Sequence, residues 1–307
     1  MPADAMAEDH STAHILQSLT GNLIIAVGKG VAAVLTGSGS MVAETIHSFA
    51  DCGNQLLLLL GVKRARKPAD KLHPLGYGRA LYFWSFMVAL LLFTGGGVFS
   101  IYEGLHKIRE PEHVEKVWLG MIILGFSLCV EGWSLWGNIV EMKKRRGAKP
   151  LLRYLRDTKD SDLVVVFGEN FAAVVGLGFA FIALVMASET GDGRWDGIGS
   201  LAIGVVLVGV AGFLAFEIMS LLVGEAADPD VAQAARQLAD EHPKIDAVLH
   251  LITVQQGPGE VMVAAKIKPT MDQSAEELCE TINEFERQLK KRCPEVRWSF
   301  IEPDVKA

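Results

Sequence analysis

Long apolar stretches separated by short polar ones fill the first three quarters of the chain. Six of these stretches are long enough to cross about 30 Å of hydrocarbon as helices that rise 1.5 Å per residue. They are residues 15–36, 41–62, 81–105, 117–140, 162–187 and 197–223. The pattern therefore predicts a membrane domain over residues 1–224, an all-α bundle of six helices.

Residues 225–307, called the tail below, change to shorter amphipathic and alternating patterns. Helical and strand signals alternate in the order αββαβ. The expected elements are Pro229–Glu241, Ala247–Gln255, Val261–Lys268, Ser274–Arg292 and Val296–Ile301. Ser274 and Glu277 have the spacing of a capping box at the start of the second helix. The tail is therefore predicted to be an α+β domain with two helices on one face of a small sheet.

Composition agrees with a membrane protein that carries a soluble domain, since 50% of the residues are hydrophobic and the mean hydropathy is +0.29. The tail holds 16 acidic and 10 basic residues, so most of the net charge of −7 lies there. No basic surface typical of nucleic-acid binding is evident, and no nucleic-acid partner is expected. The four cysteines have no CxxC spacing, which argues against a disulfide framework or a zinc knuckle.

Positive charge predicts the orientation of the bundle. Fourteen Lys and Arg residues follow the second and fourth apolar stretches, against four in the loops on the other side. Because Lys and Arg mark the cytoplasmic side, both termini and the tail are expected in the cytoplasm. Residues 1–14 are polar and acidic and show neither a secretory signal nor an Arg-rich presequence. This favours a multi-pass protein of a bacterial inner membrane.

The second apolar stretch carries a stripe of ionisable residues. His47 and Asp51 are one turn apart and share a helix face with Glu44, one turn before His47. An acid at the centre of a bilayer costs about 2.5–3.5 kcal/mol on insertion scales, so such residues are usually functional. An imidazole and a carboxylate one turn apart form half of a divalent-metal site. The alternative is a hydrogen-bond cluster that only holds helices together.

Other apolar stretches add polar groups. Lys29 in the first stretch can snorkel or pair with Glu44 or with Glu131 of the fourth stretch. The fifth stretch carries Glu169 and Asn170, whose oxygens can complete a site with the second stretch. Asp196 lies near the start of the sixth stretch and is expected to cap its helix.

The sequence resembles the cation diffusion facilitator (zinc transporter) family over about 290 residues. The resemblance rests on His47-Ser48-x-x-Asp51, on the run from His73 to Arg79 (HPLGYGR), on Tyr102-Glu103-Gly104 and on the αββαβ tail. The Tyr-Gly-Arg run before the third stretch and the Glu169-x-x-Ala-Ala pattern look like the branch that contains the mitochondrial zinc transporter of animals and its bacterial relatives.

The resemblance implies a Y-shaped homodimer in which each protomer has six membrane helices and a cytoplasmic ferredoxin-like domain. It implies export of a divalent metal, commonly Zn²⁺, in exchange for protons. The family's transport site takes two ligands from the second span and two from the fifth. The first pair maps onto His47 and Asp51.

The fifth span departs from the family pattern of His or Asp, three residues, then Asp. Alignment places Val166 and Asn170 at those positions, while Glu169 faces about 100° away from Asn170. The predicted ligands are His47, Asp51, Glu169 and Asn170. Three protein ligands plus water, or recruitment of Glu44, are the alternatives. A site richer in oxygen would accept Mn²⁺, Fe²⁺ or Co²⁺ as well as Zn²⁺.

The tail also departs from the family pattern. The family often binds regulatory zinc there through histidines, and the corresponding positions hold Ala265, Cys279 and Phe300. The tail is therefore expected to dimerise without a full metal cluster, and no resident cofactor is expected.

Together these features predict a secondary active transporter rather than an enzyme, a divalent-cation/proton antiporter with Zn²⁺ as the first candidate cargo. No P-loop or Rossmann glycine pattern supports nucleotide-driven pumping or redox chemistry. The rival hypothesis is a non-transporting membrane protein that senses metal or acts as a scaffold, because the fifth-span ligands are weak. A membrane hydrolase would need a substrate-recognition feature, which the sequence does not offer.

Overall fold

The computed structural model describes residues 3–111, 114, 116–147 and 150–306. It divides into two compact units. The first comprises Met1–Gly61, Trp84–Tyr154 and Asp162–Ile218, and the second comprises Val62–Phe83, Leu155–Ser161 and Met219–Ala307. Two segments that connect helices of the bundle therefore pack with the tail rather than with the bundle.

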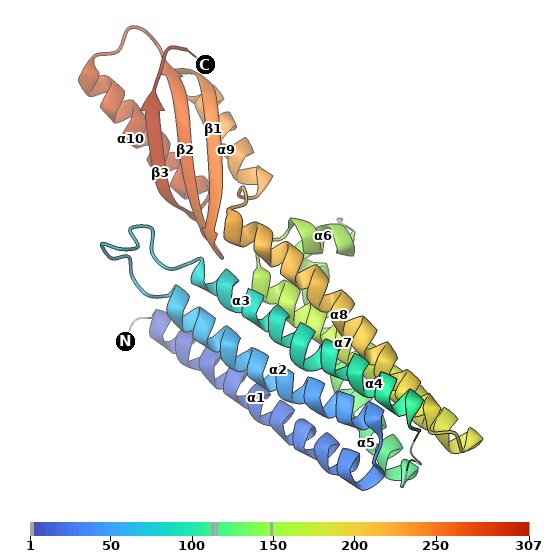
Figure 1. Ribbon diagram of the computed structural model, residues 1–307. Coiled ribbons are helices and arrows are strands. Elements are labelled where there is room, and N and C mark those ends of the chain that lie inside the picture. The colour runs from blue at the N-terminus through green and yellow to red at the C-terminus, as the bar shows by residue number, and fades with distance from the viewer. Residues whose placement is uncertain (1–2, 112–113, 115, 148–149, 307) are drawn as a thin grey trace. The chain divides into compact units, whose positions relative to one another are not determined.

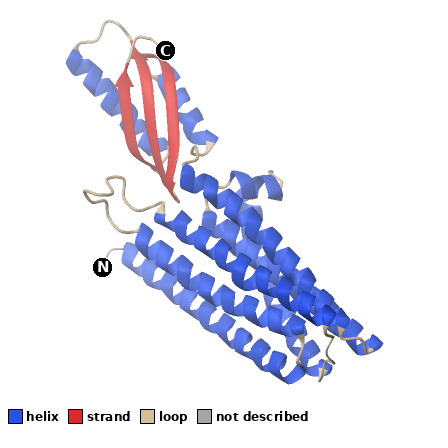
Figure 2. Cartoon of the chain, viewed as in Figure 1, coloured by secondary structure: helices blue, strands red, loops and turns tan. Residues whose placement is uncertain are grey.

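The helices of the first three quarters run back and forth in Figure 1 and account for nearly all of the blue ribbon in the lower part of Figure 2. They are α1 (Ala3–Thr36), α2 (Gly39–Ala65), α3 (Ala80–Leu91), the π-helix η1 (Leu92–Val98), α4 (Phe99–Arg109), α5 (Val117–Arg146), α6 (Leu151–Asp157), α7 (Ser161–Thr190) and α8 (Arg194–Val223).

Among the described residues, four helical stretches are long and apolar enough to cross a membrane: Ala80–Arg109, Val117–Arg146, Leu163–Thr190 and Arg194–Val223. They coincide with the last four stretches expected from the sequence, so the chain is a multi-pass membrane protein. The first two expected spans lie in α1 and α2. In α1 a shorter apolar helix, Asn22–Thr36, is found, and α2 is interrupted by polar residues such as Glu44 and Asp51. Six spans therefore stay a prediction.

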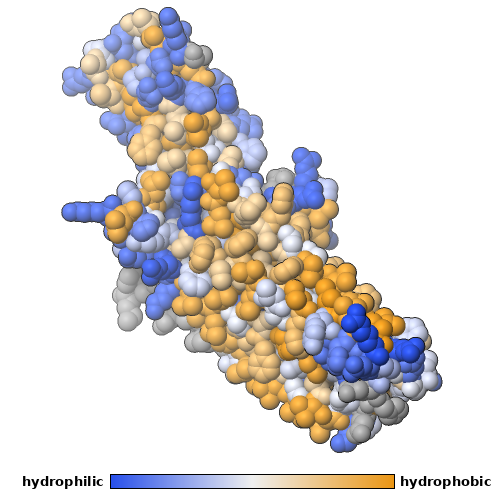
Figure 3. Space-filling view, in the orientation of Figure 1, coloured by the Kyte–Doolittle hydropathy of each residue, from blue (hydrophilic) through white to orange (hydrophobic). Residues whose placement is uncertain are grey.

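The exposed surface of α5 is largely apolar. Large apolar side chains such as Trp118, Ile122 and Phe126 are exposed along this helix. Hydrophobic residues also gather over much of the helical part of the molecule in Figure 3. Since soluble monomers rarely expose apolar patches this extensive, the surface is suited to lipid.

The run Gly95-Gly96-Gly97 lies in the π-helix η1 and lets this segment approach α8 closely. A Cβ built on Gly97 would lie 2.7 Å from Val208 Cγ2, and one on Gly104 would lie 2.5 Å from the backbone nitrogen of Leu201. Small residues in a helix permit a bend or a close approach of a neighbour, and the structure shows close approach to α8.

The sequence suggested that Asp196 caps its own helix, and the structure shows that this prediction is wrong. The residue lies inside the first turn of α8 and is fully buried, and its carboxylate accepts from the backbone N–H groups of Gly39 and Ser40 at the start of α2. Asp192 instead accepts from Arg194 N, 2.9 Å away, at the start of α8. Asp196 lies two residues inside α8, past the position of an N-cap, and its carboxylate instead meets N–H groups in the first turn of α2.

The tail folds in the expected order αββαβ (Figure 2). Its elements are α9 (Pro229–Glu241), β1 (Ile245–Gly257), β2 (Glu260–Pro269), α10 (Ala275–Arg292) and β3 (Val296–Pro303). The sheet order is β1-β2-β3, antiparallel between β1 and β2 and parallel between β2 and β3. Alternate residues of β2, such as Val263 and Ile267, share one core with Leu238 of α9 and Phe285 of α10. Both helices therefore cover the same face of the sheet.

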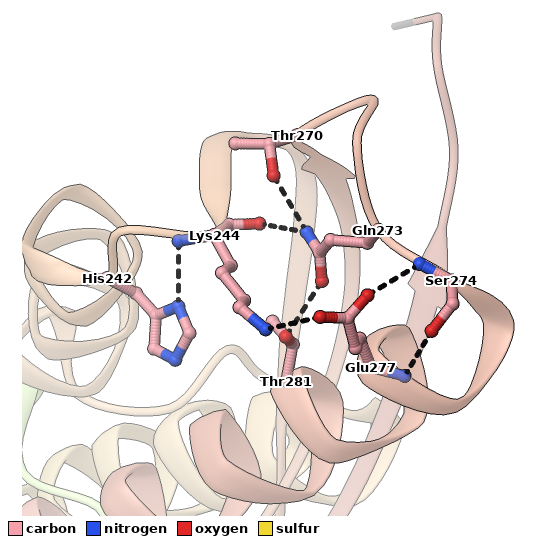
Figure 4. Close-up of polar contacts among 7 residues, drawn as sticks. All are labelled: His242, Lys244, Thr270, Gln273, Ser274, Glu277 and Thr281. Atoms are coloured by element: carbon pink, nitrogen blue, oxygen red, sulfur yellow. Dashed lines mark hydrogen bonds and ion pairs between the residues drawn. The ribbon is translucent and has the colours of Figure 1, made fainter.

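Polar contacts fix the start of α10 (Figure 4). The capping box is confirmed: Glu277 N donates to Ser274 Oγ at 3.2 Å, and Ser274 N donates to Glu277 Oε2 at 2.8 Å. These bonds lower the pKa of Glu277, which keeps its carboxylate ionised. Gln273 donates to the carbonyl of Lys244 at 2.7 Å and so joins this corner to the start of β1. His242 Nδ1 accepts from Lys244 N, which gives this histidine a structural role.

Candidate metal site

The centre of the candidate site is the pair His47 and Asp51 on α2. The helix places both on one face, with His47 fully buried and Asp51 mostly buried. His47 Nδ1 lies 3.6 Å from Asp51 Oδ1, too far for a good hydrogen bond. Neither ring nitrogen of His47, nor Asp51 Oδ1, has a hydrogen-bond partner among the described residues. Buried polar atoms without partners are costly, which makes this pair a candidate for binding a ligand.

Glu169 on α7 is one of the acids on other helices that interact with this pair. It is buried, its charge interacts with that of Asp51, and its Oε1 has no hydrogen-bond partner in the described part of the chain. Asn54, three residues beyond Asp51 on α2, lies beside Glu169 and interacts with it through its side-chain amide. The sequence analysis did not select Asn54, although its i+7 spacing from His47 places it on the same helix face.

Asn170 has a different neighbour. Its amide donates to Ser134 Oγ on α5 at 3.1 Å, so its side chain bridges α7 to α5. A side-chain amide held in this way retains its oxygen as a possible ligand. Ser134 was not selected from the sequence, and nothing in its immediate neighbours along the chain signals the contact.

Glu44 is paired with a lysine. Lys29 of α1 donates to Glu44 Oε2 at 3.1 Å and to Ser48 Oγ at 2.8 Å. Of the two partners suggested from the sequence, Glu44 and Glu131, the ion pair is with Glu44. Glu131 on α5 also interacts electrostatically with Lys29, His47 and Asp51. The polar interior of the bundle is therefore one connected set of charges from α1, α2, α5 and α7.

The donor atoms in this set suit a small divalent metal. An imidazole nitrogen and carboxylate oxygens are ligands that Zn²⁺ accepts, and additional oxygens favour Mn²⁺ or Fe²⁺. Within the described residues no three His, Cys, Asp or Glu side chains are grouped closely enough to hold a metal as they stand. Metal binding by this set would require side chains such as Glu169 to move toward the α2 pair.

These observations define a class: a multi-pass membrane protein with His, Asp and Glu side chains buried between apolar helices. Residues 15–223 match the cation efflux transmembrane domain. The chain belongs to the cation efflux family.

Among its relatives is the mitochondrial proton-coupled zinc antiporter SLC30A9 of Xenopus laevis, 33% identical over 241 residues, which are 78% of this chain and 43% of that protein. The human protein of the same name is 28% identical over 313 residues, covering 89% of this chain and 55% of that one. The chain thus spans about half the length of these curated relatives. A solved C-terminal domain of the magnetosome protein MamM is 14% identical and covers 26% of this chain and 94% of its own, with a TM-score of 0.24.

Proposed function

We propose that this chain is a divalent metal cation efflux transporter that carries Zn²⁺ and exchanges it for protons. The observation that carries the proposal is the buried pair His47 and Asp51, whose facing atoms lack partners within the described residues of an apolar bundle. Family membership and the names of the zinc antiporter relatives support the same activity.

The proposed site lies between α2 and α7. His47 and Asp51 bind the metal from α2, and Glu169 is the third ligand because it is the buried acid of α7 that interacts with Asp51. The oxygen of Asn170 or a water completes the coordination. Glu44 is left out, since Lys29 occupies one of its oxygens.

Proton exchange follows from ligand chemistry. A carboxylate and a neutral imidazole must lose their protons before they bind metal, so metal uptake releases protons. Histidine suits this exchange, since its ordinary pKa of about 6.5 lies near physiological pH. Access from alternate sides would then load metal on one side and protons on the other.

The proposed architecture extends the observed one. It comprises six membrane helices over residues 1–224, a cytoplasmic ferredoxin-like domain over 225–307, both termini in the cytoplasm of a bacterial inner membrane, and a homodimer. Charge supports this orientation, because the loops after α2 and α5 hold most of the Lys and Arg residues of the bundle.

Metal flux into proteoliposomes with a pH gradient tests the function. We expect Zn²⁺ flux that depends on the gradient, and a loss of at least about a hundredfold in Asp51→Ala, because one of few ligands is removed. Glu169→Ala should lose flux as well. Glu189→Gln is the matched control, since this exposed glutamate ends the same helix and should transport normally.

The outcomes separate the rival functions. Wild-type flux in Asp51→Ala would disprove the site, and loss only in Asp51→Ala would remove Glu169 from it. Stoichiometric Zn²⁺ binding with no flux for Zn²⁺, Mn²⁺, Fe²⁺ or Co²⁺ would favour a metal sensor or scaffold instead.

A further inference from the structure

Lys29 is a positive charge built into the interior of the bundle. Its side chain is fully buried, and its ammonium group donates to Glu44 Oε2 and to Ser48 Oγ. A buried charge persists only when it is paired and hydrogen-bonded, and these two partners come from successive turns of α2. Lys29 therefore fixes α1 against the segment of α2 that carries the candidate metal pair.

Glu44 is confined from two sides. One oxygen is held by Lys29, while the other, Oε1, lies against α7: a Cβ built on Gly176 would come within 2.6 Å of it. Oε1 has no hydrogen-bond partner among the described residues. Within the described chain, the carboxylate therefore keeps one oxygen without a hydrogen-bond partner and interacts electrostatically with His47, while the ammonium group of Lys29 restrains its other oxygen.

The charge of Lys29 also reaches the metal-ligating groups. It interacts electrostatically with His47 and Asp51 on α2 and with Glu131 on α5. A cation at this place opposes the arrival of a divalent metal, whereas an unpaired Glu44 would attract one. The two residues together leave the local charge balanced.

We propose that Lys29 is a positioning residue that holds Glu44 away from the transported metal and so limits how many carboxylates the site can offer. The inference rests on the proposed metal site. Its consequences are two. Binding stays weak enough for the metal to leave, which transport requires. A site short of carboxylates also disfavours Mn²⁺ relative to Zn²⁺, because Mn²⁺ prefers oxygen ligands.

The test is metal binding to the purified full-length chain in detergent, with Zn²⁺, Mn²⁺ and Co²⁺ as probes. In Lys29→Met, Glu44 is released and can join the site. We expect tighter binding of Zn²⁺, by roughly tenfold, the lower end of what residues one step removed from a metal contribute. Mn²⁺ should gain more than Zn²⁺. The visible absorption of bound Co²⁺ should also change, because its ligand set changes.

A second variant guards against loss of folding. Lys29→Met combined with Glu44→Gln replaces the ion pair by a neutral pair of similar size, which buried ion pairs often tolerate. We expect Zn²⁺ affinity within about threefold of wild type and an unchanged Co²⁺ spectrum. Lys107→Met is the matched control: this lysine is also buried, but it donates to Gly37 O at the far end of α1, and its removal should leave metal affinity unchanged.

Several results would overturn the proposal. Tighter binding in Lys29→Met with an unchanged Co²⁺ spectrum would show that Lys29 acts by charge alone. Unchanged affinity would show that it has no influence on the site, and loss of Zn²⁺ binding in the double variant would make Glu44 a ligand. If instead wild type binds no Zn²⁺, or Asp51→Ala binds it equally well, the proposed site itself fails.

Discussion

Asp196 accepts hydrogen bonds from three successive residues of the α1–α2 turn. Ser38 Oγ donates from 2.6 Å and Ser40 N from 3.2 Å, and Gly39 N donates to the second oxygen. Ser38 is the N-cap of α2, since its Oγ accepts from Met41 N at 3.2 Å, and the carboxylate of Asp196 accepts from the N–H groups of Gly39 and Ser40 in the same first turn. One side chain of α8 therefore fixes the start of the helix that carries His47.

At the residue scale, we predict that Asp196→Asn destabilises the protein by about 2 kcal/mol, since an amide offers one acceptor oxygen and no charge. Thermal unfolding of the purified protein measures this loss. Asp192→Asn is the comparison, because exposed Asp192 accepts from Arg194 N at the start of α8. Its effect should be below about 1 kcal/mol. Equal losses in the two variants would contradict the special role of Asp196.

At this scale, the sequence predicts which site residues share a helix face but not which residues meet across helices. The spacing of His47 and Asp51 placed both on one face of α2, because i and i+4 lie together on any helix. The same spacing left the partner of Lys29 open between Glu44 and Glu131, since distances between helices depend on packing that no single helix encodes. Asn54 was missed for the same reason: its importance comes from its proximity to Glu169 of α7.

At the element scale, α4 and α8 meet through glycines. Gly104 packs against the backbone of Leu201 and Gly197, while Gly204 packs against Ile101 and Gly97. Gly97 of η1 and Gly104 of α4 are seven residues apart, as are Gly197 and Gly204 of α8, and backbones approach closely where side chains are absent. The apolar pattern predicted where these helices lie in the sequence, but the π-helix of η1 and this pairing depend on contacts between segments about a hundred residues apart.

Gly104→Ala should separate the two helices. Its Cβ would lie 2.8 Å from Gly197 O and closer still to Leu201 N, both backbone atoms that cannot move alone. We expect a loss of about 1–3 kcal/mol in the free energy of unfolding. Gly125→Ala on α5 is the control, because its Cβ meets nothing within 4 Å. That change should be neutral or stabilising by up to about 1 kcal/mol, and a large loss there would point to a general intolerance of alanine.

At the scale of the whole molecule, the compact units do not follow the order of the chain. The α2–α3 segment, Val62–Phe83, packs in the same unit as the tail. Gly78 lies against the end of β1: a Cβ on it would be 2.8 Å from Gln256 O and 3.1 Å from Gly257 Cα. The composition indicates that the apolar stretches end near residue 225. It does not predict the contact between Gly78 and the end of β1, because the sequence of neither segment identifies the other.

We predict that Gly78→Ala opens this contact. Amide hydrogen exchange of the full-length protein should become faster at residues 66–79 and 255–260, while exchange in the bundle helices stays unchanged. Leu72→Ala provides the control in the same loop, since Leu72 is 85% exposed. Unaltered exchange in Gly78→Ala would mean that the loop and the hairpin pack independently.

The contact between Gly78 and Gly257 has a practical consequence for tagging this protein. The tip of a β-hairpin is normally a safe place to insert a reporter, because it is exposed and free of contacts. Here the Gly257-Pro258-Gly259 turn begins with a residue that has no room for even a methyl group. A fluorescent or epitope insert belongs instead beside Met271, in the exposed connection between β2 and α10.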